Sequence, residues 1–145
     1  MTSGSLLRWS RFLQVAAAVV IALSAVLVLA PGIGGAIFNL VYFGQTGHPV
    51  PFPAEADAYI RFSNGVLGAV MTGWMIAVIA IARGPFVEGR PWAWRTVAGS
   101  IAGWFLIDTA FSATLGAWGN AALNTAMVLM FAVPLLATRR QFRGR

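Results

Sequence analysis

Four long apolar stretches fill most of this sequence, and they limit the folds that it can adopt. The stretches cover residues 12–30, 58–82, 96–115 and 121–137. A helix needs about 20 apolar residues to cross about 30 Å of hydrocarbon, and each stretch is close to that length. Because four spans and their connections use up the chain, we expect a single integral membrane domain over residues 1–145. The predicted fold class is all-α, a four-helix transmembrane bundle.

The composition is typical of a chain that is solvated by lipid. Only 10% of the residues are charged and the mean hydropathy is +0.77, whereas about 25% of the residues in a soluble domain are charged. The net charge of +6 does not indicate a nucleic-acid partner, because the arginines flank apolar spans and do not form one water-facing patch. The expected partner of these arginines is the lipid bilayer.

The arginines also predict an orientation. All but Arg61 lie before the first span, between the second and third, or after the fourth; they are Arg8, Arg11, Arg83, Arg90, Arg95, Arg139, Arg140, Arg143 and Arg145. Short Arg-rich segments stay on the cytoplasmic side, so both termini are predicted to be cytoplasmic. The absence of Lys and the abundance of Ala and Gly are typical of GC-rich bacterial genomes. We therefore expect a multi-pass protein of the bacterial inner membrane.

Several kinds of chemistry are excluded by composition. The chain has no cysteine, which removes disulfides, thiol nucleophiles and iron–sulfur ligation. The only histidine, His48, lies in a Pro-rich connection, so haem held by paired histidines from two helices is excluded. The four carboxylates are too few and too scattered for a metal-ligand set. No cofactor and no metal are therefore predicted.

The connection between the first two spans is long for a compact bundle. Pro31 ends the first span. Residues 33–44 are apolar but too short to cross, so we expect a short interfacial or re-entrant segment after the first helix. The second helix is expected to begin near Pro53. Glu55 and Asp57 would then lie in its first turn, where the helix dipole favours acids.

Small residues predict where helices meet in lipid, because they let two backbones approach closely. They are Gly65, Gly68, Ala69 and Gly73 in the second span and Gly99 and Gly103, a GxxxG, in the third. Packing inside the bundle is favoured over a dimerisation face. Trp74 and Trp104 lie in the middle of their spans, so the aromatic belt at the membrane surface does not account for them.

Asp108 is the only acid inside a span. It lies ~18 Å along its helix from Thr96, slightly past the midplane toward the outer surface. An ionised carboxylate there costs on the order of 2.5–3.5 kcal/mol, so Asp108 should face the bundle interior and have a partner or a proton. If Arg61 turns inward, it pairs with Asp108 and bridges the second and third helices. The predicted polar site comprises Arg61, Asn64, Asp108, Ser112, Asn120 and Asn124.

Three interpretations of this site are open. It is a polar network that specifies helix register, an outward-facing pocket for a small molecule or lipid headgroup, or a protonatable site. In the third case desolvation keeps Asp108 neutral for proton-coupled transport or acid–base chemistry. An enzyme would need a second titratable group, and only Glu55, Asp57 or His48 could supply it. No catalytic residue is predicted.

The layout resembles the DoxX-like group of small bacterial membrane proteins. The shared features are four short spans, a Pro31-Gly32 break after the first, and Arg61-x3-Gly65-x3-Ala69-x3-Gly73 at the start of the second. The resemblance implies a four-helix membrane bundle, which in some members is an accessory part of a membrane oxidoreductase. It implies no catalytic residues.

The favoured function is therefore non-enzymatic: an accessory or ligand-binding membrane protein with an outward-facing polar cluster. A larger membrane complex or a homo-oligomer is the expected protein partner. The first alternative is a small proton- or cation-coupled transporter that uses Asp108. The second is a membrane enzyme that acts on a lipid or an isoprenoid.

Overall fold

The computed structural model describes residues 3–47 and 52–142, and these residues contain helices but no strands. Four helices are long and apolar enough to cross a membrane: α1 (Ser3–Leu29), α3 (Ala54–Arg83), α4 (Pro91–Thr114) and α5 (Trp118–Thr138). A shorter helix, α2 (Pro31–Phe43), follows α1, and a 3-10 turn, η1 (Arg139–Phe142), follows α5. The predicted fold class is confirmed, and the architecture is that of a multi-pass membrane protein. His48, Arg143 and Arg145 lie outside the described residues.

The helices begin earlier than the apolar stretches within them. Pro91 occupies the first turn of α4 and Pro53 the N-cap of α3, positions where a missing N–H costs nothing because helix N-termini leave those groups unpaired. Glu55 and Asp57 lie in the first turn of α3, as predicted. With 30 residues, α3 is ~45 Å long, so its polar first turns extend beyond the ~30 Å hydrocarbon layer.

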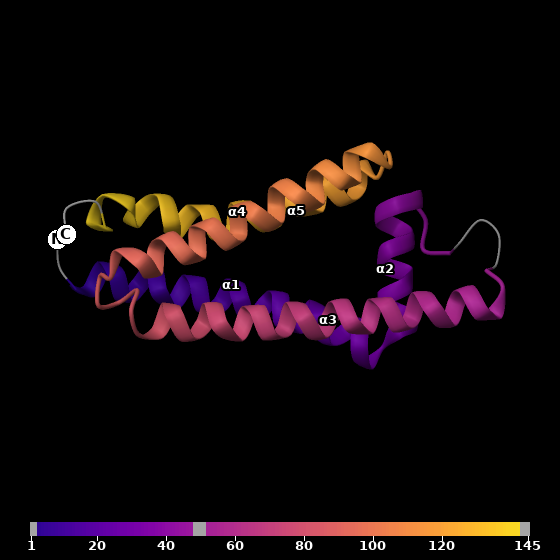
Figure 1. Ribbon diagram of the computed structural model, residues 1–145, viewed down its shortest axis with the longest axis horizontal. Helices are drawn as coiled ribbons and strands as arrows, with labels where there is room; N and C mark the ends of the chain where they lie inside the picture. The colour runs from indigo at the N-terminus through magenta and orange to yellow at the C-terminus, as the bar shows by residue number, and fades with distance from the viewer. Residues whose placement is uncertain (1–2, 48–51, 143–145) are drawn as a thin grey trace.

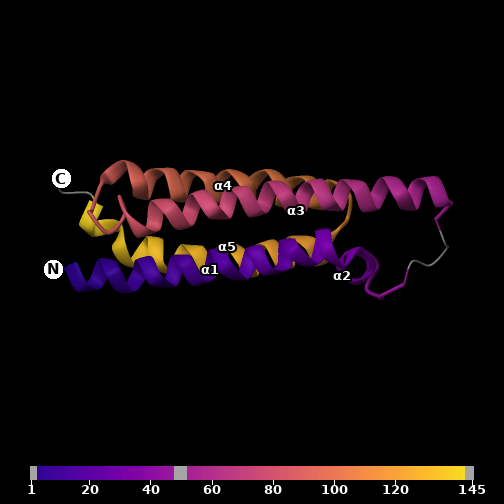
Figure 2. The ribbon, with the colours of Figure 1, turned by 90° about the horizontal axis from the view of Figure 1, so that it is seen from below.

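The long helices form two antiparallel pairs, α1 with α3 and α4 with α5 (Figures 1 and 2). The start of α1 and the turn η1 lie at one end of the bundle, called the terminal end below (Figure 1). A hydrogen bond from Gln141 to Ser5 (3.4 Å) joins them there. The two pairs are close at the terminal end and diverge toward the opposite end, called the α2 end (Figure 1).

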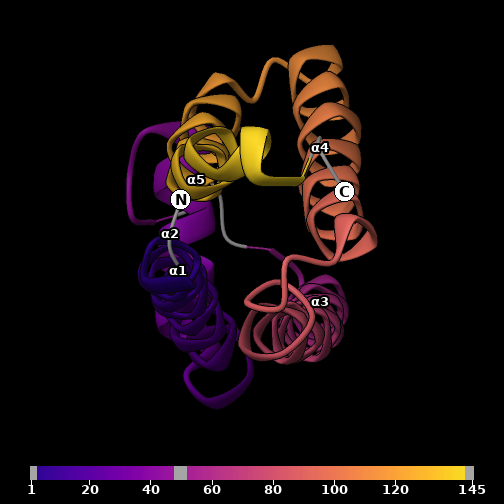
Figure 3. The same ribbon diagram turned by 90° about the vertical axis from the view of Figure 1, so that its left-hand side faces the viewer.

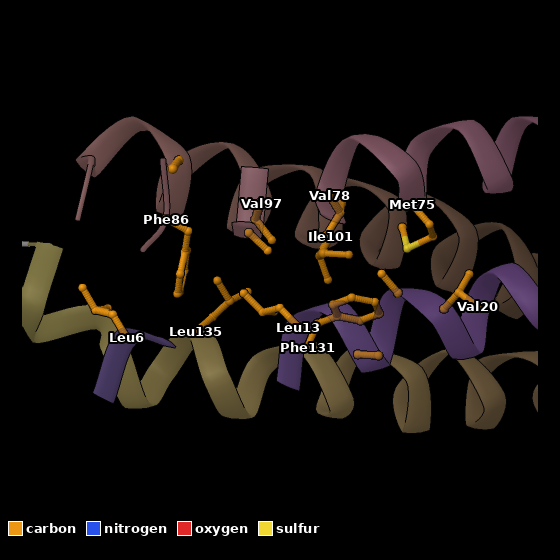
Figure 4. Close-up of a cluster of buried hydrophobic side chains, with 14 of the residues drawn as sticks. Leu6, Leu13, Val20, Met75, Val78, Phe86, Val97, Ile101, Phe131 and Leu135 are labelled. Carbon is orange, nitrogen blue, oxygen red and sulfur yellow. The ribbon is translucent and has the colours of Figure 1, made fainter. Parts of the chain in front are cut away.

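The apolar core lies mainly in the terminal half, between the two pairs (Figure 4). Phe86, from the loop between α3 and α4, is fully buried there. Its ring centroid is 5.0 Å from that of Phe142 in η1. Leu13 of α1 and Phe131 of α5 are also buried in this cluster. The α3–α4 loop and η1 therefore cover the terminal end of the core.

The α1–α3 pair is held by one close approach and one buried hydrogen bond. A Cβ atom on Gly68 would lie 2.6 Å from the backbone oxygen of Ser24. Near the terminal end, the Ser10 hydroxyl donates to the backbone oxygen of Ala82 at 2.6 Å. The other predicted packing glycines have open space within 4 Å of an added Cβ; they are Gly65, Gly73, Gly99 and Gly103. Within the described bundle, only Gly68 packs as predicted.

Helix α2 runs crosswise between the two pairs at the α2 end (Figure 1). Gly119, in the first turn of α5, contacts the backbone oxygen of Val41. The Tyr42 hydroxyl donates to the backbone oxygen of Leu115 at 3.4 Å. The short segment expected after the first helix is therefore a helix that lies across the bundle and contacts the turn between α4 and α5.

Candidate functional site

Three of the predicted site residues form one hydrogen-bonded cluster between α4 and α5. The Asn120 side-chain nitrogen donates to Asp108 Oδ1 at 3.1 Å and to Ser112 Oγ at 2.8 Å. The Ser112 hydroxyl donates to the backbone oxygen of Asp108 at 2.7 Å, with Oδ1 3.3 Å away. Asp108 and Ser112 are one turn apart on the same face of α4. We call Asp108, Ser112 and Asn120 the Asp108 cluster.

The Asp108 carboxylate is satisfied at only one of its oxygens. Among the described residues, no group donates a hydrogen bond to Oδ2, and no Arg side chain lies within ion-pair distance of it. In the same residues, every buried side-chain N or O atom has a hydrogen-bond partner. Oδ2 therefore retains some accessible surface, although Asp108 as a whole is half-buried.

Asn124 makes a second polar contact between the same two helices. It is buried, and its side-chain nitrogen lies 3.4 Å from Thr109 Oγ1, a long and therefore weak hydrogen bond. Thr109 was not among the predicted site residues. The signal for it was present in the sequence, since it follows Asp108 directly on a helix that faces two asparagines of α5.

Arg61 does not join the cluster. Its Nε donates to Asp57 Oδ2 at 2.7 Å within α3, and the two side chains are 55% and 45% exposed. An acid four residues before a base is a favourable order on a helix, and α3 and α4 are diverging at this level. Arg61 therefore does not turn inward, and the Arg61–Asp108 pair that depended on that orientation is not formed. Asn64 is half-buried on α3 and makes no side-chain hydrogen bond within the described residues.

Trp74 of α3 and Trp104 of α4 are in contact across the two pairs near mid-span. Their ring centroids are 6.0 Å apart, with planes inclined by 55°, a geometry that stabilises aromatic pairs. Trp104 lies one turn before Asp108 on α4. The Asp108 cluster therefore begins one turn beyond the Trp74–Trp104 contact, on the side where the pairs diverge.

The geometry limits what the cluster can do chemically. An amide and a hydroxyl orient the carboxylate, and its second oxygen can accept a hydrogen bond or bind a positive charge. In the part of the chain that the structure describes, Glu55, Asp57 and Glu88 form no hydrogen bond or ion pair with the cluster; Asp57 pairs with Arg61, and Glu88 with Arg90. Binding or proton exchange at Asp108 therefore fits this arrangement better than acid–base catalysis by two groups.

The hydrogen bonds predict which substitutions are energetically coupled. We expect Asp108→Ala and Asn120→Ala to be non-additive by ~0.5–3 kcal/mol, because each removes the partner of the other. Arg61→Ala combined with Asp108→Ala is the control and should be additive. Denaturant unfolding in detergent micelles, followed by circular dichroism, measures both cycles. Additivity in the Asp108–Asn120 cycle would show that the cluster is not formed.

Comparison with known proteins identifies no relative. No protein-family model matches the chain, and no curated protein or solved structure matches it either. Conclusions about function therefore depend on the residues and geometry of the Asp108 cluster.

Proposed function

We propose that this chain is a ligand-binding or accessory membrane protein in which the Asp108 carboxylate is the binding group. The observation that carries the proposal is the asymmetry of that carboxylate. Oδ1 is hydrogen-bonded to Asn120, whereas Oδ2 is accessible and has no donor among the described residues. A purely structural aspartate would be expected to have both oxygens satisfied, because unpaired polar groups are costly in lipid.

The chemistry of the cluster suggests the class of ligand. All the described hydrogen bonds that reach Asp108 come from neutral donors, so an ionised Asp108 would have no compensating cation among the described residues. A ligand with an ammonium group would supply one, and a ligand hydroxyl or N–H would supply a donor. The apolar side chains near Asp108 favour a ligand with an apolar part; Ile107 and Phe111 are 75% and 63% exposed. An amphiphilic amine has both properties.

The distribution of arginines supports the proposed orientation. The terminal end carries the described arginines of α1, α4 and η1 and the last residue of α3, whereas only Arg61 lies at the α2 end. By the positive-inside rule, the terminal end is cytoplasmic and the Asp108 cluster lies toward the outer surface. We propose the inner membrane of a bacterium as the location. The DoxX-like layout is compatible with this proposal and remains a prediction.

The second candidate is a small transporter that uses Asp108 as a proton or cation site. The observation that favours it is the arrangement of two helix pairs that meet near mid-span and diverge beyond (Figure 1). Such pairs can move as rigid bodies about their contact. Proton-coupled uptake into liposomes that is abolished by Asp108→Asn in folded protein would favour this candidate. No observation favours the membrane enzyme.

Carbodiimide labelling tests the proposed binding group. We expect dicyclohexylcarbodiimide, an apolar reagent for protonated carboxyls, to modify Asp108 in protein reconstituted in lipid nanodiscs. Decylamine should slow the modification, whereas decanol, which has the same chain and no charge, should slow it much less. Peptide mass spectrometry identifies the modified residue, and Asp108→Asn is the control.

Two results would contradict the proposal. Modification of exposed Glu55 without modification of Asp108 at every pH tested would show that the reagent does not reach Oδ2. Equal protection by decylamine and decanol would show that the carboxylate does not recognise charge. The accessory role has its own test, since a pull-down in mild detergent should then recover a larger membrane complex or a homo-oligomer.

A further inference from the structure

A shallow apolar groove runs along the surface between α4 and α5, in the terminal half of the bundle. Its volume is about 190 Å³, and its walls include Trp94, Ala98 and Ala102 of α4 and Val128, Ala132 and Leu136 of α5. Alanines make the groove, because larger side chains at these positions would fill the space between the helices. Leu136 is 65% exposed and Ala102 is also exposed, so the groove opens to the surroundings of the protein.

The walls of the groove are held in place by a hydrogen bond. The Trp94 indole N–H donates to the backbone oxygen of Leu135 at 2.9 Å. In a regular α-helix, the backbone N–H of Arg139 would donate to this oxygen. In the 3-10 turn, that N–H donates to the backbone oxygen of Leu136, and the oxygen of Leu135 can accept from Trp94. This hydrogen bond therefore fixes Trp94 of α4, one wall of the groove, against α5.

Three exposed arginines lie within one helical turn of groove residues, toward the terminal end. Arg95 lies one turn before Ala98 on α4, and Arg139 and Arg140 follow Leu136 by one turn. All three are exposed, and none pairs with a carboxylate among the described residues. Figure 3 shows η1, in yellow, between the ends of α5 and α4, and η1 contacts both helices. Buried Phe142 anchors this turn.

We propose that the groove binds one acyl chain of an anionic phospholipid from the leaflet at the terminal end, with its phosphate held by Arg95 and Arg140. The apolar groove lies on two helices that are long and apolar enough to cross a membrane, and the arginines follow at its end, where headgroups are expected. A guanidinium donates two parallel hydrogen bonds to a phosphate, and basic residues at a membrane surface attract anionic lipid. This site is separate from the Asp108 cluster and does not depend on its function.

Native mass spectrometry of the full chain tests the proposal. The protein is released from micelles that contain phosphatidylglycerol or phosphatidylcholine with identical acyl chains, and the bound lipid is counted. We expect phosphatidylglycerol to be retained in preference to phosphatidylcholine. Arg140→Gln should lower its affinity about five-fold, and Ala98→Leu should lower it similarly by filling the groove while leaving every arginine in place.

Matched controls separate a specific site from general attraction. Arg11→Gln removes an exposed arginine of α1 at the same end, and Ala110→Leu enlarges an exposed alanine of α4 beyond the groove; both should retain lipid as the unmodified protein does. Ala132→Leu fills the groove from α5 and repeats the test if Ala98→Leu does not fold. Equal retention of the two lipids would overturn the proposal, as would full phosphatidylglycerol binding by the groove-filled variants.

Discussion

Phe86→Ala is expected to lower the free energy of unfolding by about 3–5 kcal/mol, the range for removing a buried aromatic side chain. Phe86 has no exposed surface and packs against Phe142 at a ring-centroid distance of 5.0 Å. It lies in the loop between α3 and α4, beyond the spanning helices. Unfolding therefore exposes it to water or headgroups, and burial contributes its full hydrophobic free energy. The loss would also release η1 from the core.

Phe111→Ala is the matched control for this substitution. Phe111 is 63% exposed on α4, so its removal should change the free energy of unfolding by about 0.5 kcal/mol or less. Denaturant unfolding in detergent micelles, followed by circular dichroism, compares the two variants. A similar loss of stability in both would show that the terminal core is not the main packed region of the bundle.

Gly68→Ala is expected to destabilise the bundle by about 1–3 kcal/mol, the usual cost of overpacking. The new Cβ would lie 2.6 Å from the Ser24 backbone oxygen and 2.9 Å from Val28 Cγ2. Because one obstacle is backbone, rotation of a side chain cannot relieve the clash, and α1 and α3 must move apart. This cost exceeds the gain of about 1 kcal/mol that alanine brings to a helix interior.

Gly65→Ala, three residues earlier on the same helix, is the control for Gly68→Ala. An added Cβ there meets no atom within 4 Å, so only the gain in helix propensity remains and the variant should be slightly stabilised. Thermal unfolding in detergent measures the opposite signs of the two effects. If Gly68→Ala were as stable as Gly65→Ala, α1 and α3 would not be in close contact at this position.

Local features of the sequence predicted the helical elements well. Pro31 begins a new helix and Pro53 precedes another, because a proline ring determines its own φ angle and removes a donor whatever surrounds it. The acids in the first turn of α3 follow a different local rule, because the helix dipole favours negative charge there. The exact starts of α1 and α4 were missed because hydropathy marks the apolar part of a helix, whereas the polar turns beyond it are also helical.

The candidate site was predicted in part. Asp108 and Ser112 share a face at four-residue spacing, and that relation is independent of the rest of the fold. Asn120 meets them because the α4–α5 turn is short. The Arg61–Asp108 contact is not formed, because Arg61 has a local partner, Asp57, four residues away on the same helix. Sequence spacing alone did not show that α3 and α4 diverge at this level.

The sequence by itself determined the number of spanning helices, the positions of their breaks and the end of the bundle at which the arginines gather. Only the tertiary structure decided that α1 pairs with α3 and α4 with α5, that Gly68 packs whereas Gly65 and Gly73 do not, and that Trp74 meets Trp104. The physical reason is the solvent. Lipid covers any apolar helix face as well as another helix does, so pairing depends on a few close approaches and buried hydrogen bonds, which hydropathy does not record.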